Sequence, residues 1–408
     1  MKFRMRITPF ALSALVILPA VACHEDDRPS SALRSQTRDS AGIRIIENSR
    51  PADGSRLGWR VGPGPAVSIG TVEGEVPYLF AAATDATTLR DGRIVVVDMG
   101  SDELRVFDAL GSHLASWGGR GEGPGEFIDL YHVDRWPGDS IAAGDYRNES
   151  ITVFDSDGNF GRIVRLESDP FPWDLRALFA HGLYMVTSEG AVLVSRQRPG
   201  SDEVDIRILD GEGRLRGSLG RHPGWPSLVE RDMVLYQPIF SRALAVEPWA
   251  GLVVIAPTDR SEIRVFTQTG TLARIVRLGK EPRAPERAHI DAYIESQVSR
   301  VSSEDADDRA RMRRDYNAVP VAERFPVFTS VIADAEDHLW VEEYEVPGEE
   351  RDGVLWTVVD PGGRVLGLVE TPEGLEIYEI GDDFILGRVR DELDVEYIQV
   401  WPLERWEG

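Results

Sequence analysis

The sequence is short of cysteine, lysine and asparagine. Its one cysteine, Cys23, excludes an intrachain disulfide and also excludes zinc or iron–sulfur sites built from several thiolates. Lysine occurs only as Lys2 and Lys280, so the basic side chains are almost all arginine. The seven histidines are scattered, with no HExxH motif and no close pair, and no GxSxG nucleophile elbow is present. The common hydrolase motifs are therefore missing.

The composition indicates an acidic globular protein. The formal net charge of the 408 residues is −24, so the summed field repels nucleic acid and anionic membrane surfaces. A hydrophobic fraction of 42% is ordinary for a globular protein and excludes wholesale disorder. We expect no nucleic-acid partner, and we expect a monomer.

The first 23 residues read as a signal peptide. Lys2, Arg4 and Arg6 precede a mostly apolar stretch, 7–21, that is too short to span a bilayer comfortably. The segment Ala20-Val21-Ala22-Cys23 then resembles a bacterial lipoprotein processing site, which implies lipidation of Cys23 and a cell-envelope location, periplasmic or on the outer-surface side. Ordinary secretory cleavage remains the alternative. Residues 24–56 are polar and predict a flexible tether, with only the patch 43–46 able to pair on a sheet edge.

A repeated four-strand unit organises the rest of the chain. Residues 91–127 contain three strand signals separated by turns, and Val106-Phe107-Asp108 recurs as Val153-Phe154-Asp155. Further copies occupy 137–166, 180–220, 250–279 and 336–370, and a last copy over 375–403 offers only three strands. The pattern of residues 58–70 resembles the fourth strand that the last copy lacks. If this segment pairs with the last copy, it closes the copies into a ring, and the sheets at the two ends of the chain no longer have an exposed edge. The prediction is an all-β fold, a six-bladed β-propeller over 57–404.

The stretch DGRIVVVDMGSDELRVFDALGSHL, at 91–114, resembles the NHL repeat. More broadly, the chain is similar to bacterial six-bladed propellers of the NHL-like and TolB-like kind, many of which are lipoproteins. That resemblance implies that inter-blade connections and the turns after each second strand share one face.

One segment breaks the β pattern. Between the fourth and fifth blades, residues 282–320 are strand-poor, and Ile290, Tyr293, Ile294 and Val298 recur with helical spacing. We predict a helical hairpin inserted in the connection between these blades.

Candidate ligand contacts lie on the expected connection face. Asp98, Asp145 and Asp259 stand near second-strand ends, and Arg120 and Glu122 stand in the glycine-rich exit of the first blade. Aspartate at strand ends is also what turn chemistry favours, so a structural role is the competing interpretation. The glycine-rich exit lacks the spacing of a phosphate-binding loop, which favours a tight crossing between blades.

Two function classes follow. The first is a lipid-anchored, non-enzymatic binding module for a protein, peptide or glycan, without a cofactor and touching the membrane only through its anchor. The second is a lactonase-like or gluconolactonase-like hydrolase with a divalent metal, such as Ca²⁺, in the central channel. That chemistry needs a glutamate and several asparagines and aspartates from different blades, and asparagine occurs only four times. A purely structural envelope protein is a third reading.

Lipidation is tested by Cys23→Ser. Because the thiol is the acylation site, we expect the variant to lose palmitate labelling and to leave the membrane fraction. Membrane fractionation that is unchanged in Cys23→Ser would contradict the lipoprotein interpretation.

Overall fold

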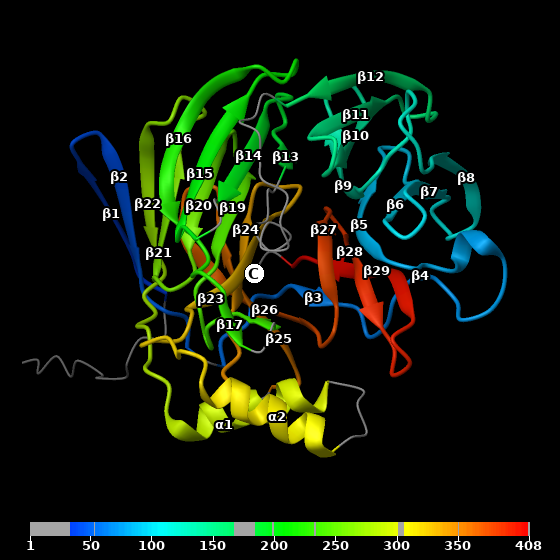
Figure 1. The fold of residues 1–408 in the computed structure, drawn as a ribbon. Coiled ribbons are helices and arrows are strands. Elements are labelled where there is room, and N and C mark those ends of the chain that lie inside the picture. Colours follow the sequence, from blue (N-terminus) through cyan, green and yellow to red (C-terminus); the bar gives the residue numbers. More distant parts are fainter. Residues whose placement is uncertain are drawn as a thin grey trace, which may run out of the picture. The chain divides into compact units, whose positions relative to one another are not determined.

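The computed structural model describes residues 33–52, 54–166, 184–197, 200–231, 234–300, 306–349 and 351–406. Within them, six four-stranded antiparallel blades are arranged in a ring (Figure 1), which confirms the predicted six-bladed β-propeller. Cys23 and the rest of the predicted signal peptide lie outside the described residues.

The blades follow the chain, each from its inner to its outer strand. Blade one holds β5 (Ala83–Thr88), β6 (Ile94–Asp98), β7 (Glu103–Phe107) and β8 (His113–Gly118). Blade two holds β9 (Leu130–Trp136), β10 (Ser140–Asp145), β11 (Ser150–Phe154) and β12 (Phe160–Arg165). Blade three holds β13 (Tyr184–Val186), β14 (Val192–Gln197), β15 (Glu203–Leu209) and β16 (Leu215–Pro223). Blade four holds β19 (Leu244–Trp249), β20 (Leu252–Pro257), β21 (Glu262–Phe266) and β22 (Leu272–Arg277). Blade five holds β23 (Phe328–Ala333), β24 (Leu339–Glu343), β25 (Gly353–Val359) and β26 (Val365–Pro372). Blade six holds β27 (Glu376–Ile380), β28 (Phe384–Arg390) and β29 (Glu396–Glu404).

The N-terminal segment closes the ring, as the sequence predicted. Strands β3 (Arg60–Val61) and β4 (Val67–Ile69) both pair antiparallel with β29, and so complete blade six from the other end of the chain. Ile69 is 1% exposed and packs in a core shared by blades six and one. Gly70 follows at φ +138°, where an added Cβ would stand 2.4 Å from the carbonyl oxygen of Glu396. The closure thus depends on a buried isoleucine and on a glycine that lets two backbones approach.

Residues 35–48 differ from the flexible tether that we expected over 24–56. They form a hairpin of β1 (Ser35–Ser40) and β2 (Ile43–Asn48), and β2 adds in parallel to the outer strand of blade four. Ile46 is 1% exposed within the core of blades four and five. The amide of Asn48 donates to the carbonyl oxygens of Arg277 and Gly363 and accepts from the backbone N–H of Val365. This short apolar patch therefore docks on the ring, and the asparagine at its end joins two blades.

The helical insertion is present between blades four and five. It consists of α1 (Arg287–Ser299) and α2 (Ala306–Asn317), and Ile294 and Val298 are buried on one face of α1. They share a core with Tyr236 of β18 (Val234–Tyr236), which forms a small hairpin with β17 (Val229–Arg231). In the described part of the chain, neither helix is long and apolar enough to cross a membrane.

Lys280 ties the start of the insertion to blade five. Its Nζ donates to the carbonyl oxygen of Val327 at 3.0 Å and lies 2.7 Å from Oε2 of Glu343. Burial lowers the pKa of Lys280, although Glu343 opposes the shift. Since Lys280 precedes the insertion and Val327 follows it, one ammonium group joins both of its ends to the sheet.

Ring closure is tested by Ile69→Asp. A carboxylate in this buried position has no partner, so we expect the free energy of unfolding to fall by about 3 kcal/mol or more in urea titrations. Val72→Asp is the matched control, because Val72 is 62% exposed just beyond the strand. Equal stability of the two variants would contradict the closure.

Candidate functional site

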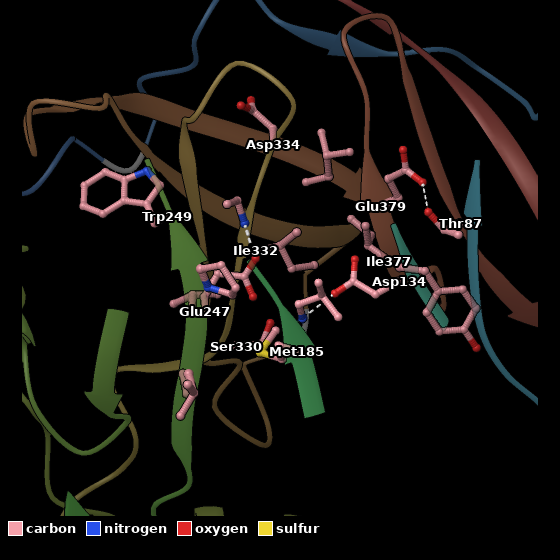
Figure 2. Close-up of a pocket in the computed structure, with 18 of the residues that line it drawn as sticks. Thr87, Asp134, Met185, Glu247, Trp249, Ser330, Ile332, Asp334, Ile377 and Glu379 are labelled. Atoms are coloured by element: carbon pink, nitrogen blue, oxygen red, sulfur yellow. Dashed lines mark hydrogen bonds between the residues drawn. The ribbon is translucent and has the colours of Figure 1, made fainter. Parts of the chain in front are cut away.

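The channel contains a cavity of about 650 Å³. It is lined by residues of β5, β9, β13, β19, β23 and β27, the innermost strand of each blade. Figure 2 shows side chains from several of these strands converging on it. A cavity of this size is typical of small-ligand sites, so the channel is the candidate functional site.

Six channel residues occupy equivalent registers and form a ring. Each pairs with the second or third residue of its blade's second strand. In blade order, the ring consists of Thr87, Asp134, Met185, Glu247, Ile332 and Glu379. All six are labelled in Figure 2. Carboxylates therefore alternate with uncharged side chains around the channel, with the acids on blades two, four and six.

The three ring carboxylates join neighbouring blades. Asp134 accepts the backbone N–H of Val186 at 2.8 Å, and Glu247 accepts that of Ala333 at 3.0 Å. Glu379 accepts that of Thr88 at 2.7 Å. Each bond runs from an even-numbered blade to the next blade in the ring. Because the inner strand of a blade has a free edge, its amides need partners, and these carboxylates supply them.

A fourth carboxylate, Asp85, makes a similar joint and also holds a histidine. It accepts the N–H of Val133 at 3.0 Å and of Ala86 at 2.8 Å. Its Oδ2 lies 2.5 Å from Nδ1 of His132, whose Nε2 is 3.9 Å from Oδ2 of Asp134. Burial alone would lower the pKa of His132, but Asp85 and Asp134 outweigh it and raise that pKa to about 10. The imidazole is therefore a cation at neutral pH and cannot act as a general base.

Glu247 differs from the other channel carboxylates. Only its Oε1 has a hydrogen-bond partner among the described residues, the N–H of Ala333. Burial raises the pKa of Glu247 to about 8, and the charge of Asp134 adds to the effect, while Ala333 and His132 oppose it. This carboxyl group is thus largely protonated at neutral pH.

Two of the residues predicted for the binding face are structural. Asp98 is 0% exposed, accepts the N–H groups of Ala81 and Ala82 at 3.1 and 3.0 Å, and pairs with Arg105 at 2.5 Å. Asp145 is 1% exposed and accepts the N–H of Ile128 at 2.8 Å. Both carboxylates fix an incoming inter-blade connection to the end of a second strand, so neither is available to a ligand.

The other three candidates are at least partly accessible. Arg120 is exposed in the connection between blades one and two, 3.8 Å from the carboxylate of Asp102. Glu122 is exposed nearby. Asp259 is half-buried beside Arg260. In this blade the hydroxyl of the neighbouring Thr258 accepts the N–H of the incoming connection, whereas an aspartate does so in blades one and two. The structure does not bring these three side chains together into one site.

Aromatic side chains line the cavity near the connection ends of the inner strands. Tyr131 is 39% exposed and meets Tyr146 edge to face, with ring centroids 5.8 Å apart. The hydroxyl of Tyr378 donates to the carbonyl oxygen of Ala83 at 3.0 Å, and Trp225 also lines the cavity. Burial raises the pKa values of both Tyr131 and Tyr378, so these rings are neutral contact surfaces.

Sequence reasoning missed the ring. Its acids stand inside strands, where they repeat no turn motif, and they differ in type between blades. The one signal in the sequence was a charged residue in an otherwise apolar inner strand, as at Glu247 in LAVEPW.

The channel does not fit a metal centre. Among the described residues, no group of three or more histidine, cysteine, aspartate or glutamate side chains could hold a metal ion. Asp85, Asp134 and Glu379 already accept backbone N–H groups with the oxygens that a cation would need. A calcium site of the lactonase kind would have to break these joints between blades.

Comparison with known proteins adds only a similarity of fold. No family model and no curated protein matches the chain. Among solved structures, a member of the DUF4221 family from Bacteroides vulgatus is 8% identical, with a TM-score of 0.49 over 85% of this chain and 99% of that one. A putative exported protein from Bacteroides fragilis is 13% identical, with a TM-score of 0.47 over 89% and 100%. Virginiamycin B lyase from Staphylococcus aureus is 10% identical, with a TM-score of 0.42 over 92% and 100%. At these values, nothing about the function of this chain follows.

The charge state of His132 is tested by Asp85→Asn. Removing the nearest anion should lower the pKa of His132 from about 10 toward its ordinary value near 6.5, as measured by NMR titration of the imidazole. A raised histidine pKa stabilises the fold below pH 6.5, and this contribution is lost as the pH rises through 10. The free energy of unfolding of the variant should therefore fall less over this pH range than that of the wild type. Asp157→Asn, in an exposed turn, is the control. An unchanged titration of His132 in Asp85→Asn would contradict the pairing.

Proposed function

We propose that the protein is a binding module of the bacterial cell envelope, anchored by lipid at Cys23. It takes a protein, peptide or glycan at the connection-face mouth of the channel and releases it chemically unchanged. The resemblance of the repeat to NHL-like and TolB-like propellers and the processing-site pattern at Cys23 support the envelope location.

One observation carries the binding function. Three of the channel carboxylates, Asp85, Asp134 and Glu379, are occupied in joining the blades, while the cavity beside them stays open. His132 is paired with Asp85 and charged, so it offers no lone pair to abstract a proton. An aromatic-lined opening whose polar groups already bond to the protein is suited to recognition more than to turnover.

Tyr131 is the expected contact at the mouth. It presents an accessible ring with few rotatable bonds, and such rings contribute strongly to recognition of peptides and sugars. The charges of Glu376 and Arg388 lie close enough to influence the pKa of its hydroxyl. These groups could supply polar contacts around the aromatic surface.

The metal-dependent hydrolase is the weaker candidate. Its chemistry needs several oxygen ligands that converge on one ion, with open positions for water and substrate. The channel carboxylates of blades one, two and six instead satisfy backbone amides of the next inner strand. A saturable rise in melting temperature with Ca²⁺, together with hydrolysis of a lactone, would favour this alternative.

The proposal is tested on peptide and glycan arrays with the purified protein. For a ligand captured on the arrays, Tyr131→Ala should weaken binding by about tenfold, because the variant loses the aromatic contact that the ligand covers. Phe160→Ala is the matched control, since Phe160 is a 42% exposed aromatic residue on the outer strand of blade two. Mass spectrometry of the recovered ligand should show no change in mass. Consumption of the ligand, or equal binding by the two variants, would contradict the proposal.

A further inference from the structure

Of the three ring carboxylates, Glu247 is the one that keeps an oxygen without a partner among the described residues. Asp134 uses Oδ1 for the N–H of Arg135 and Oδ2 for that of Val186. Glu379 receives the hydroxyl groups of Thr87 and Thr88 as well as a backbone N–H. Oε2 of Glu247 has no partner within the described part of the chain, and the residue lines the cavity.

The neighbours of Glu247 in the ring explain this difference. Met185 of blade three and Ile332 of blade five occupy the positions on either side of it, and both are only partly buried because they face the channel (Figure 2). Neither can donate a hydrogen bond to a carboxylate. By contrast, Glu379 has Thr87 beside it as a hydroxyl donor. The two ring positions that flank Glu247 are therefore both apolar.

The charge around this position favours a cation. The groups that influence the pKa of Glu247 are Asp134 and His132, and His132 is itself paired with Asp85. Three carboxylates and one imidazolium leave this cluster with an excess of negative charge when Glu247 is ionised. His132 Nε2 also lacks a hydrogen-bond partner among the described residues, so the imidazolium does not neutralise Glu247 through a direct bond.

We propose that Glu247 receives the ammonium group of an alkylammonium ligand, such as a lysine side chain, whose methylene stem lies against Met185 and Ile332. This inference rests on the proposed binding function and names the chemistry of its ligand. A charged head meets the free carboxylate oxygen, and an apolar stem covers the flanking side chains. A metal ion would lack the other ligands that it needs, and a polyhydroxylated ring would leave its hydroxyl groups against apolar surface.

Such a ligand binds only the ionised form of Glu247. With its pKa raised to about 8 by burial, the carboxyl group is mostly protonated at pH 6.5 and mostly ionised at pH 9. Apparent affinity scales with the fraction of protein in the competent form, so it should increase about 30-fold between these pH values. The alkylammonium group keeps its own charge over the same range.

The experiment titrates n-butylammonium into the protein at pH 6.5 and pH 9, with 1-butanol as the uncharged probe of similar shape. Calorimetry should show saturable binding of butylammonium that strengthens with pH, and none of butanol. Glu247→Gln retains the Oε1 acceptor for Ala333 but cannot become an anion, so it should fold normally and lose at least tenfold in butylammonium affinity at pH 9. Glu379→Gln is the matched control, because that carboxylate has no free oxygen, and its affinity should stay within twofold of the wild type.

A blocked peptide with one lysine, compared with its Nε-acetyllysine form, extends the test to a macromolecular ligand. Preference for the free lysine in the wild type, but not in Glu247→Gln, is the expected result. Equal butylammonium binding by wild type and Glu247→Gln, absence of saturable binding at pH 9, or affinity that does not rise with pH would each overturn the inference. The proposed binding function would survive those results if array ligands still bind in a manner that depends on Tyr131.

Discussion

The free edge of the innermost strand is the constraint on which this channel is built. In each blade, that strand pairs on one side only, so alternate N–H groups point toward the channel and need an acceptor. Asp85, Asp134, Glu247 and Glu379 each accept one such N–H from the next blade around the ring. A hydrogen bond to a charged group contributes about 1.5–3 kcal/mol, so the joints made by Asp85, Asp134 and Glu379 stabilise the arrangement of the blades as well as satisfying the amides.

This constraint also decides what the channel can do. A carboxylate that already accepts amide N–H groups is a poor general base and a poor metal ligand. The acidic lining of the channel is therefore better suited to recognition than to catalysis. Glu247 is the exception, because it makes the same joint with one oxygen and keeps the other in the cavity. Structural need and ligand contact therefore coexist in one side chain, and its two apolar ring neighbours separate it from Asp134 and Glu379.

The sequence predicted the architecture because propeller blades repeat their turns and apolar strands. The three-strand last blade and the orphan strand over 58–70 were enough to infer the closure through β29. The spacing of Ile290, Ile294 and Val298 predicted the helical insertion. Of the hairpin over 35–48, only the pairing of the patch 43–46 on a sheet edge was predicted, because β1 is exposed throughout and carries no apolar pattern. The sequence predicted that Asp98 and Asp145 stand at strand ends. It could not predict whether each carboxylate faces solvent or a backbone amide, because that depends on the path of the connection beside it.

Amide hydrogen exchange on the inner strands tests the central claim most directly. We expect the N–H groups of Thr88, Val133, Val186 and Ala333 to exchange as slowly as the hydrogen-bonded amides between strands, although they lie on a strand edge that no other strand covers. Exchange of these four amides at the rate of exposed loop amides would show that the carboxylates do not hold the inner strands. It would then leave the acids of the channel free for other chemistry.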